Sequence, residues 1–171
     1  MNPELRRELE KTITDIFEKS KKIVQITKGH PPVLFLLRTN GDVESIDFSS
    51  YIEDKDLMAV MLKSYQLQDD LDGTILMTEA WVIKVDKDSE IGQRIGDDSL
   101  TEEDLEVLQP SESPDREEVL FFMAETKAGD ITAQAPIIRK SKNEATLGEL
   151  EFMMQDASEF RGRFIGGSSN S

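Results

Sequence analysis

The acidic residues between Gln68 and Glu79 have the types and spacing of a calcium-binding loop. Asp70, Asp72 and Glu79 carry carboxylates at intervals that such a loop uses, and Gly73 stands where it would turn. Two features oppose this interpretation. Gln68 occupies the first ligand position, and the residues after Glu79 are typical of a strand. We therefore favour an acidic helix-to-strand turn in which Gly73 adopts a positive φ.

A second arrangement of carboxylates depends on how two apolar segments pair. If the strands around Trp81 and Phe121 are antiparallel neighbours in a symmetric register, Glu79 lies near Glu125. Two such carboxylates can share a proton or hold a divalent ion. A slip of one residue moves one of them to the other face of the sheet. The favoured alternative is two exposed glutamates on a solvated sheet face.

Histidine and cysteine chemistry is almost excluded by composition. The chain has no cysteine and one histidine, His30, so it lacks a thiolate nucleophile and an ordinary structural zinc site. His30 lies between Gly29 and two prolines, which is typical of a loop residue at the start of a strand; a general base is the less favoured alternative. No phosphate-cradling glycine loop and no nucleophile elbow occurs. The sequence leaves an enzymatic role open but favours a non-enzymatic one, and we expect no cofactor.

The net charge of −15 is concentrated in one segment. Residues 86–118 hold 13 acidic and 3 basic side chains, a net charge of −10. An acidic surface repels phosphate backbones, so we expect no nucleic-acid partner. The sequence has no apolar run of membrane-spanning length and no signal-peptide pattern at its start, which predicts a cytoplasmic protein without membrane contact.

The elements of the first half can be predicted from periodicity and turn signals. An apolar stripe with helical spacing predicts a helix from residue 3 to about 24. Val33–Arg38 and Val43–Phe48 flank Asn40-Gly41, a strong hairpin signal. Leu57–Tyr65 has helical spacing again and predicts a second helix.

Three further strands are predicted in the second half. They are Ile75–Val85, Val119–Thr126 and Ile131–Lys140, the last two joined by a tight turn. Pro136 cannot donate to a neighbouring strand, so we expect an edge or a bulge there. The segment 147–154 is ambiguous between strand and helix.

The predicted order is helix, strand, strand, helix, strand, strand, strand. Hairpin connections imply an antiparallel sheet of about five strands with two main helices, an α+β fold in which we expect the helices on one face. Residues 1–165 form a single domain in this prediction, with an acidic insertion at 86–118. Residues 166–171 form a disordered tail.

Candidate binding residues lie on either side of the acidic insertion. Trp81, the only tryptophan, is either a core residue, which we favour, or a partly exposed interface anchor. Asp115, Arg116 and Glu117 precede a predicted strand. In the favoured interpretation Arg116 pairs with Glu79 or Asp115, and in the other it forms an anion clamp.

Glu79-Ala80-Trp81 and, further along the chain, Pro110–Val119 (PSESPDREEV) form a pair of motifs. The pair resembles a signature of small uncharacterised bacterial and phage-borne proteins, and the resemblance covers roughly Thr74 to Arg139. It implies relatedness and carries over no catalytic residue.

Two functional hypotheses follow from the sequence. The first is a non-enzymatic protein-binding or assembly protein of bacterial or phage origin, in which the acidic insertion or the sheet face contacts a protein partner or a second copy of the chain. The alternative is a divalent-metal-dependent hydrolase or a calcium-responsive protein that uses Glu79 with Asp70, Asp72 or Glu125.

Overall fold

The computed structural model describes residues 1–82, 116–153 and 163–164, with isolated positions at 90, 93–94, 99 and 101–103. The first half contains α1 (Pro3–Thr27), β1 (Val33–Arg38), β2 (Val43–Asp47), α2 (Ser49–Ile52) and α3 (Lys55–Gln66). The strands that follow are β3 (Leu71–Val82), β4 (Glu117–Thr126), β5 (Gly129–Ser141), β6 (Glu144–Leu147), β7 (Glu151–Phe152) and β8 (Arg163–Phe164).

One antiparallel sheet forms the centre of the molecule. Its strand order is β2-β1-β3-β4-β5-β6, with β7 paired to β5 and β8 paired to β3. The pairing of β3 with β4 runs from Gly73 opposite Thr126 to Val82 opposite Glu117. The predicted α+β fold is confirmed, and the segments around Trp81 and Phe121 are antiparallel neighbours, as expected. The sheet has more strands than the five predicted. The prediction missed β6, β7 and β8 because they are too short to give a periodic signal.

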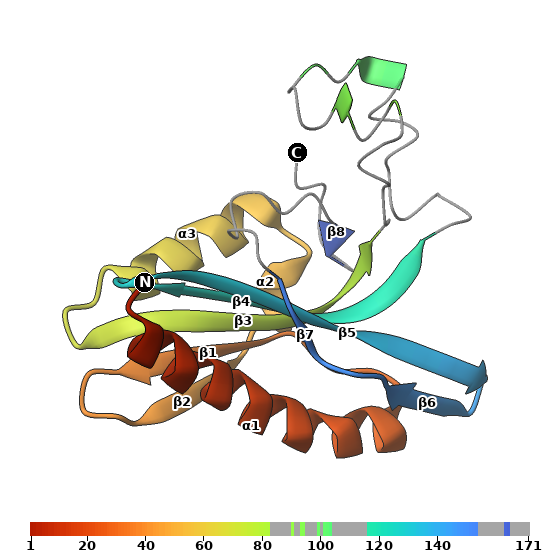
Figure 1. Cartoon of the computed structure of the whole chain (residues 1–171), viewed down its shortest axis with the longest axis horizontal. Coiled ribbons are helices and arrows are strands. Elements are labelled where there is room, and N and C mark those ends of the chain that lie inside the picture. The colour runs from red at the N-terminus through yellow and green to blue at the C-terminus, as the bar shows by residue number, and fades with distance from the viewer. Residues whose placement is uncertain are drawn as a thin grey trace.

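The helices cover both faces of this sheet, not one face as predicted (Figure 1). Neighbouring residues of a strand point to opposite faces. On β3, Ile75 and Met77 pack in one core with Phe17 of α1, while Leu76 packs in a second core with Met58 of α3. β3 is buried almost along its whole length. A run that is apolar on both faces needs cover on both sides.

Local capping sets the ends of the two main helices. The side chain of Asn2 accepts the backbone N–H of Glu4 at 2.8 Å, and a proline follows it at the first helical position. Lys28 ends α1 in the left-handed conformation with φ 64°, so the helix runs slightly further than predicted. Asp54 caps α3 by accepting the backbone N–H of Leu57 at 3.0 Å.

β5 is not an edge strand as a whole, but its outer pairing is interrupted at Pro136, as the missing donor predicted. β5 has a neighbour on each side, β4 on one and β6 with β7 on the other. The outer neighbour changes at Pro136, because β6 pairs from Ile137 onward and β7 pairs up to Gln134. The carbonyl of Pro136 accepts the N–H of Gly148 at 2.8 Å. A gap between two short strands accommodates the missing donor, and the ambiguous segment 147–154 supplies β7.

Several expectations fall on residues that are not described. They are the end of the predicted third strand at 83–85, most of the acidic insertion, and the tail 166–171. Within the described ranges, no helix combines the length and the apolar character needed to cross a membrane.

Candidate functional site

The register between β3 and β4 separates the two glutamates of the metal alternative. Glu79 lies opposite Leu120, whereas Glu125 lies opposite Thr74. Because Glu79 and Thr74 are an odd number of residues apart on β3, the two carboxylates extend from opposite faces of the sheet. The symmetric register was therefore wrong, and Glu79 and Glu125 cannot share a proton or an ion.

The two aspartates of the alternative take part in other contacts. Oδ2 of Asp70 lies 2.9 Å from Nη1 of Arg38 in an ion pair. Asp72 and Glu125 line a small pocket of about 200 Å³, below the range of ~300 Å³ and more that is typical of ligand sites. Across the described residues, no group of three or more His, Cys, Asp or Glu side chains could hold a metal ion. The geometry does not support the metal alternative.

Gly73 permits a close approach between strands and does not form a turn. The glycines with positive φ in the described chain are Gly41 and Gly129, so the positive φ predicted for Gly73 was wrong. A Cβ at Gly73 would lie 2.5 Å from the carbonyl oxygen of Glu125 and 2.8 Å from Cα of Thr126. The requirement for glycine comes from the neighbouring strand.

The Glu79 carboxylate holds the loop between α1 and β1. Its Oε1 accepts the backbone N–H of His30 at 2.9 Å. A Cβ on Gly29 would lie 2.7 Å from the same oxygen, so glycine allows this approach. Burial raises the pKa of Glu79 and the charge of Glu118 adds to the rise, while the His30 N–H and Arg139 oppose it. Glu79 therefore retains a proton to higher pH than an ordinary glutamate.

Arg139 fixes the same loop from β5. Its Nε donates to Oε1 of Glu118 at 2.8 Å, and its Nη1 donates to the carbonyl of Lys28 at 2.7 Å. Carbonyls at the end of a helix lack partners within the helix, so Arg139 satisfies one of them. The sequence analysis missed Glu118 as a site residue. The available signal was period-two alternation, which places Glu118 on the same face as Leu120, the residue opposite Glu79.

His30 is buried and does not suit general-base chemistry. Only 8% of the residue is exposed, and Nδ1 lies 2.8 Å from the carbonyl oxygen of Pro31. Nε2 is sealed from solvent and has no hydrogen-bond partner among the described residues. Burial lowers the pKa of His30 and so favours the neutral imidazole. A ring nitrogen closed off from solvent cannot reach a substrate, which leaves the loop interpretation.

The binding residues predicted around the insertion are partly brought together. Trp81 is half-buried, and Cζ of Arg116 lies 4.7 Å from the centre of its ring, in a cation–π contact. Arg116 and Glu117 are exposed, and Asp115 lies outside the described residues. Of the four predicted binding residues, Trp81 and Arg116 therefore lie in contact with each other.

The outer face of α3, defined by Leu57, Val60 and Leu67, exposes apolar side chains. These residues are 40%, 63% and 79% exposed, whereas Met58 on the inner side of the helix is buried at 8%. Helical spacing places Val60 and Leu67, the C-cap residue of α3, on the side away from Met58, and Leu57 on the adjoining flank. The sequence analysis assigned Leu57 to the inner stripe and missed Val60 and Leu67. The signal that indicated their exposure was that Val60 and Leu67 lie outside the apolar stripe predicted for the second helix.

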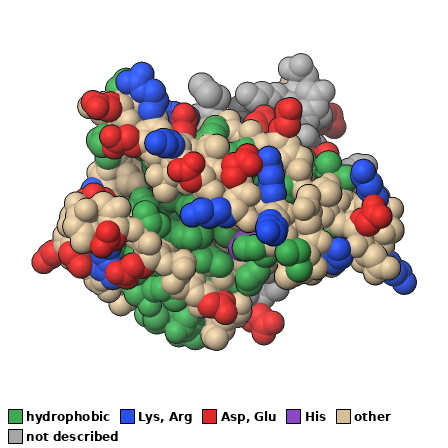
Figure 2. Space-filling model, turned by 90° about the horizontal axis from the view of Figure 1, so that it is seen from below, with side chains coloured by type: hydrophobic (Ala, Val, Ile, Leu, Met, Phe, Trp, Pro, Cys, Tyr) green, Lys and Arg blue, Asp and Glu red, His purple; other side chains and the backbone are tan. Residues whose placement is uncertain are grey.

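The apolar residues on the α1 side of the molecule differ from those on the outer face of α3. Seen from below, hydrophobic side chains gather around a hollow, with acidic and basic side chains around it (Figure 2). On the α1 side of the sheet, half-exposed apolar residues already pack against the core: Ile16, Val33, Phe35 and Leu37. They extend an existing core, while the outer face of α3 points away from one.

Comparisons with known proteins place the chain in a family. No curated protein and no solved structure matches it. The family described as bacteriophage lambda protein ea47 matches residues 1–161 of the 171 residues. The matched range includes α3 and the loop held by Glu79. A family of phage origin agrees with the relatedness that the pair of motifs implied. The chain belongs to the family of bacteriophage lambda protein ea47.

Proposed function

We propose that the chain is a non-enzymatic phage protein that acts by binding another protein, and that the outer face of α3 is its binding surface. The observation that carries the proposal is the exposure of Leu57 and Val60 on α3 and of Leu67 at its C-cap. Single exposed apolar residues are common on protein surfaces. Three along one helix and its C-cap form a patch whose removal from water favours association.

The polar groups near Glu79 support binding over catalysis. Glu79 accepts the backbone N–H of His30, and Arg139 donates to Glu118 and to the carbonyl of Lys28. These contacts stabilise the loop, and burial accounts for the raised pKa of Glu79 without a reaction. Trp81 ranks behind α3 as a docking residue, because the guanidinium of Arg116 already covers part of its indole ring.

A pull-down with matched variants tests the proposal. Wild-type chain, the double variant Val60→Asp/Leu67→Asp and the control Ile26→Asp are immobilised and exposed to lysate of phage-infected cells. Ile26 is 68% exposed on α1, so the control adds a charge at an equally accessible apolar position. We expect wild type and control to retain the same protein, and the double variant to retain about tenfold less.

Retained proteins are identified by mass spectrometry, and a second copy of the chain is detected through a distinguishing tag. Equal retention of every protein by all three baits would contradict a binding role for α3. Circular dichroism of each variant establishes that the fold is intact before retention is compared.

A further inference from the structure

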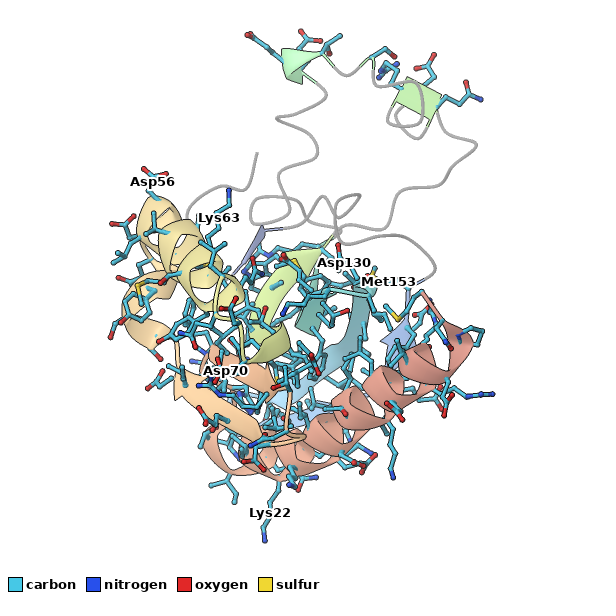
Figure 3. All side chains as sticks on the ribbon, turned by 90° about the vertical axis from the view of Figure 1, so that its left-hand side faces the viewer. Lys22, Asp56, Lys63, Asp70, Asp130 and Met153 are labelled. Atoms are coloured by element: carbon cyan, nitrogen blue, oxygen red, sulfur yellow. The ribbon has the colours of Figure 1, made fainter. Side chains whose placement is uncertain are left out.

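We infer that the partner of the outer face of α3 is a second copy of this chain, with the two α3 helices packed antiparallel across a two-fold axis beside Val60. This inference rests on the proposed function and names its partner. It comes from the charges that accompany the apolar side chains. Asp56 lies in the first turn of α3 and Lys63 in the last, and both point away from the sheet (Figure 3).

The spacing of Asp56 and Lys63 makes α3 self-complementary. Residues seven apart lie about 10 Å from each other along a helix and only ~20° apart around it. The two charges therefore share one flank of α3 but are too distant to pair within the helix. In an antiparallel pair with two-fold symmetry, each flank meets the same flank of the other copy. Asp56 of each copy then faces Lys63 of the other, and two ion pairs form.

The apolar residues fit the same arrangement. Val60 lies beside the axis and meets its own counterpart, and its short side chain allows two helices to approach to ~8–10 Å. Leu57 lies on the other flank from Asp56, so the contact has an apolar side and a charged side. Leu67, just past the end of α3, reaches the start of the second α3.

The strength of the contact follows from its size. A helix of 12 residues is about 18 Å long, so α3 against α3 forms an interface at the small end of the range for specific complexes. Such a contact predicts a reversible dimer with a dissociation constant on the order of micromolar.

Sedimentation velocity across a concentration series is the first test. We expect a monomer–dimer equilibrium for wild type and for the control Ile26→Asp. Val60→Asp places two carboxylates against each other at the axis and should weaken dimerisation by about 100-fold or more. A wild-type chain that remains monomeric up to about 1 mM, far above the expected constant, overturns the inference.

A charge exchange tests the register. Asp56→Lys and Lys63→Asp should each weaken dimerisation by about tenfold, because each replaces two attractions with two repulsions. The double variant Asp56→Lys/Lys63→Asp restores both pairs with reversed sign and should return the dissociation constant to within about threefold of wild type. If the charges acted only through the helix dipole of α3, the double variant would be the weakest dimer of the three variants, because it has an unfavourable charge at each end of the helix. A double variant weaker than both single variants overturns the inference.

A cysteine probe gives an independent measurement. The chain has no natural cysteine, so Val60→Cys can form a disulfide only between copies. Under mild oxidation at about 10 µM, a concentration at which the dimer is populated, we expect rapid conversion to a covalent dimer. Ile26→Cys, treated identically, should convert slowly, and equal rates for the two variants overturn the inference.

These tests separate the inference from the proposed function. If the chain is monomeric but Val60→Asp/Leu67→Asp still loses a retained protein in the pull-down, the outer face of α3 binds a different protein and only the second copy is excluded. If neither assay depends on α3, the proposed function fails as well.

Discussion

The helices α1 and α3 lie on opposite faces of one sheet and use their apolar residues differently. On α1 the apolar residues concentrate on the inner side; α3 has apolar residues on its inner and outer sides. The buried apolar residues of α1 are Leu9, Ile13, Phe17 and Val24, and the single one of α3 is Met58. The difference teaches that the apolar content of a helix does not by itself measure its contribution to a core.

Exposed apolar residues also occur on α1, but their distribution is different. Leu5, Ile23 and Ile26 are exposed, and Leu5 lies about 27 Å from Ile23 along the helix. Leu57 and Leu67 bracket the α3 face within about 15 Å. A partner can cover the α3 residues in one contact, whereas the two ends of α1 require separate contacts.

The largest expected effect concerns the inner side of α1. Phe17→Ala removes a buried ring and should lower the free energy of unfolding by about 3–5 kcal/mol. Leu57→Ala on the outer face of α3 should change it by no more than about 0.5 kcal/mol. Urea denaturation, at a protein concentration at which the chain is monomeric, measures the free energy of unfolding of both variants. If the two variants lost similar free energies of unfolding, α1 and α3 would not differ in their contribution to the core, contrary to the burial of their residues.

Hydrogen exchange sharpens the comparison at the level of whole helices. Because α3 has one buried apolar residue and α1 has four, α3 should open locally with a free energy roughly 2 kcal/mol lower than that of α1. Mass spectrometry of the dilute chain should show faster exchange for peptides of α3. Equal protection of both helices would remove the distinction.

The smallest expected effect concerns Glu79 and pH. Its pKa is raised in the folded chain, so the folded state binds this proton more tightly than the unfolded state does. The stabilisation is complete below the ordinary glutamate pKa and is lost as pH rises through the raised value. Glu79→Gln keeps an oxygen acceptor for the His30 N–H and removes the titration.

Relative to Glu79→Gln, the wild type should therefore lose stability as pH rises above the ordinary glutamate pKa, by about 1 kcal/mol or less because the carboxylate is only partly buried and is screened. Urea denaturation at several pH values measures the difference between the two chains. A wild type that gains stability relative to the variant as pH rises would reverse the assigned direction of the pKa shift.

Local signals were sufficient for much of the fold. The stripe in α1, the cap at Asn2 and the turn at Asn40-Gly41 depend on residues close in sequence, and each produced the predicted element. The hydropathy pattern did not lead to the prediction that helices cover both faces of the sheet. The apolar run of β3 does indicate cover on both sides, but the antiparallel connections suggested a single covered face.

The site was less predictable because it depends on register. A tight turn fixes the register of a hairpin, but β3 and β4 are joined through residues 83–116, so no local rule sets which residues face each other. That is why Glu79 was assigned the wrong neighbour and was favoured as an exposed glutamate, whereas burial raises its pKa in the folded chain. Its actual contact, the backbone N–H of His30, belongs to no side-chain pattern.

The two neighbours on one edge of β3 have a consequence for the order of assembly. β1 pairs with β3 up to Met77, and beyond it β8 pairs with Ala80 and Trp81. β1 precedes β3 in the chain and leaves the ribosome before it, whereas β8 follows β5, β6 and β7. The stretch of β3 beside Trp81 therefore gains this second neighbour only after the other strands of the sheet have been translated.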